Sequence, residues 1–176
     1  MTIFVGGVHA VGKTFLLKTT CEELAIKHAT ASQLIKEQRG LTNWTVSRQV
    51  NEIKQNQEAL IAAVRRIKNG GEAIVLDGHF VLRREANVHE KINTKTFAEL
   101  MIDGVILLEA PSTIIADRLL QRGDKTWTLK EIETFSQKEF EHAEAVCRTL
   151  NLPLVKLSMP SKLTLRNTIE NLLADQ

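Results

Sequence analysis

The sequence predicts an α/β protein in which helices cover both faces of a parallel β-sheet. Short apolar runs of strand length recur along the chain, and long stretches with helical periodicity separate them; they are residues 3–5, 73–76, 105–108 and 154–157. Strands of a parallel sheet are buried on both faces and therefore read as continuous apolar runs. A weaker fifth strand is expected near residues 28–30. The chain of 176 residues is expected to form one domain, because cores usually split only beyond roughly 250 residues.

Composition narrows the class of protein. With 43% hydrophobic and 25% charged residues the chain has the composition of a soluble globular protein. Its formal net charge of +2 is too small to indicate binding to nucleic acid or membranes through bulk electrostatics. No apolar window approaches the roughly 20 residues of a membrane span, and no basic leader is visible, so a cytoplasmic location is expected. Oligomeric state is left open.

Two predicted helices carry clear boundary signals. The first helix is expected to present a single, mainly apolar face, because the residues on that face are spaced alternately by four and three positions. These residues are Val46, Val50, Ile53, Gln57, Leu60, Val64 and Ile67. Gly70 and Gly71 are expected to end that helix. Further along, "TLKE" at residues 128–131 is a capping-box pattern and predicts a helix that runs to about Leu150.

The stretch "GVHAVGKT" matches the pattern G-x-x-x-x-G-K-[ST] and lies between a predicted strand and a predicted helix. Its glycines let backbone N–H groups turn inward, and the helix that follows adds the positive end of its dipole, so the loop predicts a phosphate site. The lysine would reach the β- and γ-phosphates and the threonine hydroxyl would ligate Mg²⁺. His9 could touch phosphate or only fill the loop. The predicted nucleotide-binding residues are Gly7, Val8, His9, Ala10, Val11, Gly12, Lys13 and Thr14.

Asp77 follows the second strong strand in "IVLDGHF" and is predicted to lie at the carboxyl edge of the sheet, where ligands of parallel sheets collect. A carboxylate there can hold Mg²⁺ beside Thr14. The alternative is an aspartate that only caps a turn with Gly78.

Arg118 and Arg122 in "ADRLLQRGD" are four residues apart on a predicted helix, so they share one face near its C-terminal end. Two guanidinium groups suit a polyphosphate, and an arginine over the transferred phosphoryl group stabilises charge in the transition state. A solvated basic helix end is the alternative from spacing alone.

Together the glycine-rich loop, "LDG" after a middle strand and D-R-x-x-x-R resemble the adenylate kinase group of nucleoside monophosphate kinases, above all the archaeal-type enzymes and their small relatives. The resemblance implies a three-layer P-loop NTPase fold with strand order 2-3-1-4-5. It also implies ATP and Mg²⁺ at the loop, with Arg118 and Arg122 clamping adenine and phosphates, and a second nucleotide between the acceptor helices and Asp77. The predicted catalytic residues are therefore Lys13, Asp77, Arg118 and Arg122, and Arg118 is also a predicted ATP-binding residue. A short lid at about residues 119–130 and acceptor-binding helices at about residues 31–69 are expected.

The resemblance places acceptor-binding candidates around Asp77. Lys36 or Arg39 falls where relatives hold the acceptor phosphate. Bacterial relatives continue after "LDG" with Phe-Pro-Arg, whereas this chain reads "HFVLRR". The expected arginine is missing from its place, and Arg83 and Arg84 are the candidates for its role slightly downstream. Gln57 could read the edge of a base, or it could be a core glutamine satisfied by backbone groups.

The leading hypothesis is therefore phosphoryl transfer from ATP to a nucleoside monophosphate. A kinase of a nucleoside or another hydroxyl compound is the first alternative. Residues 27–34 contain no Asp or Glu to act as a base near the end of the second strand, although Asp77 or Glu37 could serve as the base. A P-loop ATPase or a nucleotide-sensing regulator that acts through a protein partner is the other. Nucleic-acid binding as a main role is not expected.

Overall fold

The computed structural model describes residues 1–41 and 52–174. Its main sheet has five parallel strands, which are β1 (Thr2–Gly6), β2 (Lys27–Thr30), β3 (Ile74–Asp77), β6 (Gly104–Glu109) and β7 (Leu154–Ser158). They lie in the order β2-β3-β1-β6-β7. Numbered among themselves along the chain, that order is 2-3-1-4-5, so the predicted topology is confirmed. β1 and β3 are buried throughout, as their apolar sequences predicted.

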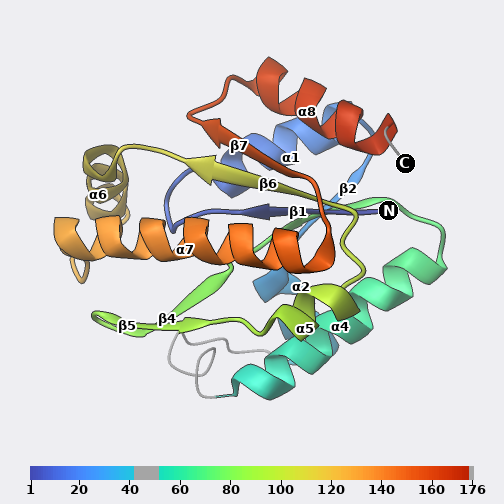
Figure 1. Ribbon diagram of the computed structural model, residues 1–176, viewed down its shortest axis with the longest axis horizontal. Coiled ribbons are helices and arrows are strands. Elements are labelled where there is room, and N and C mark those ends of the chain that lie inside the picture. Colours follow the sequence, from blue (N-terminus) through green and yellow to red (C-terminus); the bar gives the residue numbers. More distant parts are fainter. Residues whose placement is uncertain (42–51, 175–176) are drawn as a thin grey trace.

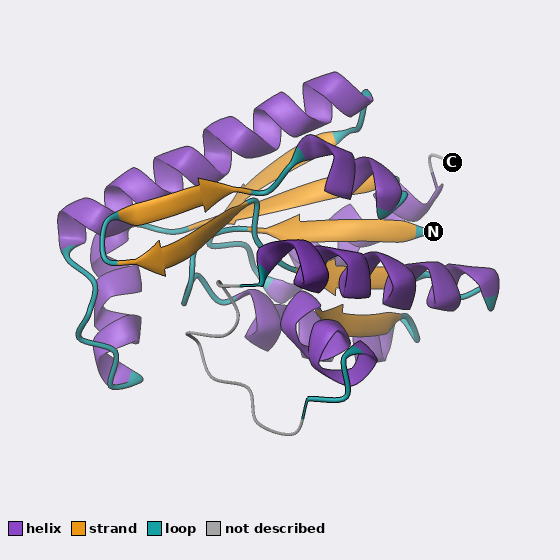
Figure 2. Ribbon diagram, turned by 90° about the horizontal axis from the view of Figure 1, so that it is seen from below, coloured by secondary structure: helices purple, strands orange, loops and turns teal. Residues whose placement is uncertain are grey.

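Helices cover both faces of this sheet and make a three-layer structure. α1 (Lys13–Glu23) and α8 (Lys162–Ala174) lie on one face, while α7 (Leu129–Leu150), α4 (Ile53–Asn69) and α5 (Thr94–Glu99) lie on the other (Figures 1 and 2). α2 (Ala31–Gln38) packs on α4, and α6 (Ser112–Gln121) packs on α7. None of the helices within the described ranges is long and apolar enough to cross a membrane.

A hairpin that the sequence analysis did not predict follows β3 directly. Its strands β4 (Val81–Glu85) and β5 (Val88–Lys91) pair antiparallel, apart from the main sheet (Figure 2). The hairpin packs against α7 at the end of the molecule where the parallel strands terminate (Figure 1). After Val81 the residues of both strands are half-buried or exposed. Their sequences therefore lack the continuous apolar run from which the buried strands were predicted.

The buried residues of α4 include some members of the predicted apolar face and other residues outside it. Leu60, Val64 and Ile67 are buried, while Ile53 and Gln57 are half-buried. Val46 and Val50, the first two members of the predicted face, lie outside the described residues. Asn56, which the analysis did not single out, is a buried polar residue of this helix. Gly70 and Gly71 end the helix as predicted.

The helix α7 begins and ends where the sequence predicted, but its capping box forms only in part. Thr128 Oγ1 accepts a hydrogen bond from the Glu131 backbone N–H at 3.1 Å. In a complete capping box the glutamate would turn back to the cap residue. Here the Glu131 carboxylate binds Arg83 and the hairpin instead.

Candidate functional site

Two glycines of the phosphate-binding loop occupy positions that other residues could not. Gly7 has φ 138° and Gly12 has φ 113°, both in the region that favours glycine. A Cβ atom at Gly7 would lie 2.4 Å from the carbonyl oxygen of Leu108 on β6. The loop can therefore pass close to the neighbouring strand before Gly12 starts α1.

Lys13 lies across the inside of this loop. Its side chain is buried, and its ammonium donates hydrogen bonds to the carbonyl oxygens of Gly7 at 2.7 Å and Val8 at 3.3 Å. Burial lowers the pKa of Lys13, and the nearby carboxylates of Asp77 and Glu139 oppose that shift. A cation held at the loop in this way is suited to a polyphosphate.

Thr14 and Asp77, the two predicted magnesium ligands, are in direct contact. Thr14 Oγ1 donates to Asp77 Oδ2 at 2.6 Å. β1 and β3 are neighbours, and Asp77 pairs in register with Val5, so the sheet itself brings the end of β3 beside the loop. Mg²⁺ prefers oxygen ligands and usually keeps several waters, so a hydroxyl and a carboxylate side by side fit that ion.

Arg118 of α6 and Arg122, the residue that caps this helix, have different surroundings. Arg118 Nη1 donates to the carbonyl oxygen of Val11 at 2.6 Å and to that of Ala10 at 3.3 Å, and so ties α6 to the loop. Arg122 caps the C-terminal end of α6 and lines the cavity next to Lys13. Arg118 therefore contacts the loop, and Arg122 shares the cavity lining with Lys13; their roles stay predictions.

A cavity of about 640 Å³ joins these groups to the acceptor side predicted from the sequence. One end holds Lys13, Thr14, Asp77 and Arg122. The other end lies among α2, α4 and α5 and is mostly apolar, with Gln57 and Asn56 as polar members; its apolar lining includes Ile35, Ile53, Leu60, Phe97 and Leu100. A second cavity of about 560 Å³ lies between α7 and the ends of β6 and β7, but Lys13, Thr14 and Asp77 do not line it.

Two histidines and a buried carboxylate adjoin the loop. His9 stacks on His79 with ring centroids 4.1 Å apart, and His79 Nδ1 lies 3.1 Å from Glu139 Oε1. Burial, reinforced by the Lys13 ammonium, lowers the pKa of both histidines well below the ordinary value. Burial raises the pKa of Glu139, which also accepts hydrogen bonds from the backbone N–H groups of Phe80 and Val81.

Glu139 was missed by the sequence analysis, although a signal for it exists. It lies on a mainly apolar face of α7 that includes Ile132, Phe135 and Val146, at spacings of three, four and seven residues, and that also buries His142. A glutamate on such a face needs an internal partner, which the backbone N–H groups of Phe80 and Val81 supply.

The predicted acceptor residues are spread over different surroundings. Gln57 lines the cavity, and its Oε1 accepts a hydrogen bond from Thr96 Oγ1 at 2.8 Å. Lys36 is exposed and does not line the cavity. Arg39 also lies outside the lining and donates to Asn56 Oδ1 at 2.5 Å. Arg83 lines the cavity, but its guanidinium is bound to Glu131 and to Thr126. The acceptor roles given to these four residues stay predictions.

Comparison with known proteins places the chain in a family. A family model described as an AAA domain matches residues 6–136, a span that includes the loop, Asp77 and both α6 arginines. The chain belongs to this family. No curated protein sequence matches the chain significantly.

Solved structures share the whole fold at low sequence identity. A shikimate kinase from Acinetobacter baumannii in complex with shikimate is 12% identical, has a TM-score of 0.64, and aligns over 99% of this chain and 93% of that one. A shikimate kinase from Bacteroides thetaiotaomicron is 14% identical, with a TM-score of 0.63 and coverage of 99% and 98%. A gluconokinase from Sinorhizobium meliloti is 13% identical, with a TM-score of 0.52 and coverage of 99% and 91%.

These likenesses establish the three-layer P-loop fold of this chain. The fold that the resemblance implied is confirmed, but a particular likeness to adenylate kinases is not, since the structures named above are kinases of other small molecules.

Proposed function

We propose that this protein transfers the γ-phosphate of ATP, bound with Mg²⁺, to a small acceptor. The observation that carries the proposal is one cavity whose lining includes Lys13 and the Thr14–Asp77 pair together with apolar residues of α2, α4 and α5. Transfer between two bound molecules needs alignment and neutralisation of charge more than it needs a protein nucleophile. Arg122, which lines the same cavity, would stabilise negative charge that develops on the transferred group.

We further propose a nucleoside monophosphate as the leading acceptor. The slot among α2, α4 and α5 is lined by apolar and aromatic side chains, with the Gln57 amide at one wall. A flat heterocycle suits such a slot, because its faces pack on apolar groups and its edge meets the amide.

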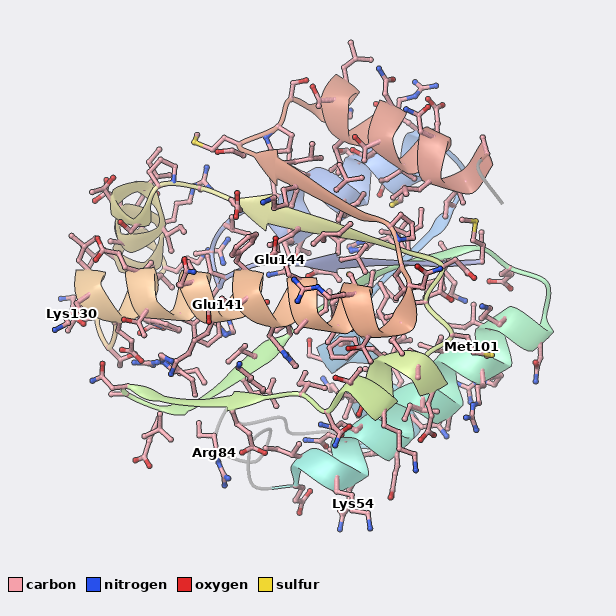
Figure 3. All side chains as sticks on the ribbon, viewed as in Figure 1. Lys54, Arg84, Met101, Lys130, Glu141 and Glu144 are labelled. Carbon is pink, nitrogen blue, oxygen red and sulfur yellow. The ribbon has the colours of Figure 1, made fainter. Side chains whose placement is uncertain are left out.

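A kinase of a hydroxyl compound is the second candidate, and one feature of the site favours it. The three residues proposed to hold an acceptor phosphate are poorly placed for that role, since Lys36 and Arg39 do not line the cavity and Arg83 is engaged by Glu131 and Thr126. Arg84 is the other hairpin arginine in the lining; it pairs with the half-buried Glu90 and extends from the hairpin away from α7 (Figure 3). The shikimate kinases and the gluconokinase that share the fold are named for compounds of this second kind.

The test is an acceptor screen with labelled ATP and Mg²⁺. Nucleoside monophosphates, nucleosides, shikimate and gluconate are offered separately to the wild type, with Lys13→Ala as the blank. Label on a monophosphate supports the leading acceptor, and label on a hydroxyl compound alone replaces it with the second candidate. ATP consumption that no acceptor stimulates would instead favour an ATPase or a nucleotide-sensing regulator.

A further inference from the structure

Arg83 makes an unusually complete set of hydrogen bonds for a residue at the edge of a cavity. Its Nε and Nη2 donate to the two carboxylate oxygens of Glu131 at 2.8 and 2.9 Å. Its Nη1 donates to Thr126 Oγ1 at 2.9 Å, and Nη2 also donates to the Thr126 carbonyl oxygen at 2.8 Å. A guanidinium has five N–H donors, so little of its binding capacity is left for a substrate phosphate.

The partners of Arg83 belong to the connection between α6 and α7, here called the lid segment (residues 122–128), and to the first turn of α7. The guanidinium carbon also lies 4.0 Å from the ring centroid of Trp127, in the geometry of a cation–π contact. The centroid of the Trp127 ring also lies 5.5 Å from that of His9 in the phosphate-binding loop. A continuous line of contacts therefore runs from the hairpin through the lid segment to the loop.

The hairpin end of this line is anchored in the interior. The Glu131 side chain is 1% exposed and that of Arg83 is 14% exposed. Glu131 Oε1 also accepts hydrogen bonds from the Asn87 backbone N–H at the hairpin turn, at 2.7 Å, and lies 3.2 Å from His89 Nε2. Asp124 organises the lid segment from within, since it accepts from Thr126 and from Trp127 Nε1.

We propose that Arg83 is a positioning residue that holds the lid segment against the phosphate-binding loop. It acts through Thr126 and Trp127, and the position that it fixes includes Arg122, the first residue of the lid segment, at the phosphate end of the cavity. The proposal rests on the proposed phosphotransferase function for its effect on turnover. It replaces the acceptor-phosphate role expected of Arg83 from the sequence.

The first experiment measures the lid segment directly and needs no turnover. The chain has two tryptophans, so Trp44→Phe leaves Trp127 as a single fluorescent reporter. Arg83→Met in that background should raise acrylamide quenching of Trp127 at least about twofold, because the segment loses its anchor. Arg166→Met is the matched control, since it removes an arginine that pairs with Glu170 on α8, across the sheet from the hairpin (Figure 1). Quenching equal to that of the control would overturn the proposal.

The second experiment separates positioning from substrate binding. With an acceptor found by the screen, Arg83→Met should lower kcat about tenfold or more and leave the acceptor KM within about twofold. Arg83→Lys should not restore kcat, because a lysine keeps the charge but loses the fork that spans Glu131 and Thr126. A raised acceptor KM with unchanged kcat and unchanged quenching would assign Arg83 to the acceptor and overturn the proposal.

A milder variant covers the case in which Arg83→Met fails to fold. Thr126→Val removes the side-chain hydroxyl of an exposed residue and with it the contacts of that hydroxyl with Arg83 and Asp124, while the pairing of Arg83 with Glu131 remains. It should give a smaller rise in Trp127 quenching with a native circular dichroism spectrum. Wild-type quenching in Thr126→Val would count against the proposal. If the wild type phosphorylates no acceptor, the proposed function fails while the quenching result still decides the role of Arg83.

Discussion

Replacing Glu139 by leucine tests how α7 holds the segment that follows Asp77. The Glu139 side chain is buried and accepts hydrogen bonds from the backbone N–H groups of Phe80 at 3.0 Å and Val81 at 3.3 Å. Leucine would leave both donors unpaired in the interior, and each such group costs about 1–3 kcal/mol. We therefore expect Glu139→Leu to lower the free energy of unfolding by about 2–6 kcal/mol. Relief from burying a carboxylate favours the lower half of that range.

Urea unfolding followed by far-UV circular dichroism gives the free energy by linear extrapolation. Glu139→Gln keeps one acceptor oxygen and should lose less than the leucine variant. Glu141→Leu is the matched control, because Glu141 is an exposed residue of the same helix (Figure 3) and surface changes of this kind usually stay within about 0.5 kcal/mol. A loss in Glu139→Leu no larger than that of the control would refute the account of Glu139 as the carboxylate that fixes this segment.

Three further predictions concern the site and its surroundings. Thr14→Val should raise the Mg²⁺ concentration for half-maximal activity about tenfold, because it removes an oxygen ligand; an unchanged Mg²⁺ titration would exclude that role. Arg122→Ala should lower kcat about 100-fold and change ATP affinity only a few-fold, as measured by kinetics and calorimetry. Turnover equal to wild type would remove Arg122 from the mechanism. Hydrogen bonds from Arg83 lower the pKa of Glu131 from 4.5 to about 2, so the stability that Glu131 contributes is present above pH 4.5 and is lost as pH falls toward 2. Glu131→Gln should flatten that part of the stability curve, and an unaltered acid slope in urea titrations would contradict the assignment.

The phosphate end of the site could be predicted from the sequence because its signals are local. The loop pattern, the strand before it and the aspartate after β3 each depend on a few neighbouring residues, and a parallel sheet gathers such strand ends at one edge. The contact between Thr14 and Asp77 follows from those rules, with the adjacency of β1 and β3 as the only non-local requirement.

The acceptor side of the site depends on contacts between residues far apart in the sequence, which short sequence patterns do not reveal. Arg83 and Arg84 are adjacent in sequence, yet one is fixed by Glu131 and Thr126 and the other pairs with Glu90 within the hairpin. Lys36 was chosen by its place in a family motif, and on α2 it is exposed and does not line the cavity. A polar residue on a mainly apolar helix face, such as Glu139, is a sequence signal for a buried side chain that needs an internal partner. Attention to such residues would have added Glu139 to the candidates around the site.

In the proposed function, Asp77 and the phosphate-binding loop act together on ATP and Mg²⁺ to transfer a phosphoryl group. The most direct measurement is the rate at which Asp77→Asn transfers label from ATP to the acceptor that the wild type uses. The amide keeps the shape of the side chain and removes its charge, so the rate should fall at least about 100-fold. ATP binding in the absence of Mg²⁺ should stay close to that of the wild type. A wild-type transfer rate in Asp77→Asn would show that the Asp77 carboxylate is not needed for phosphoryl transfer, contrary to the proposed function.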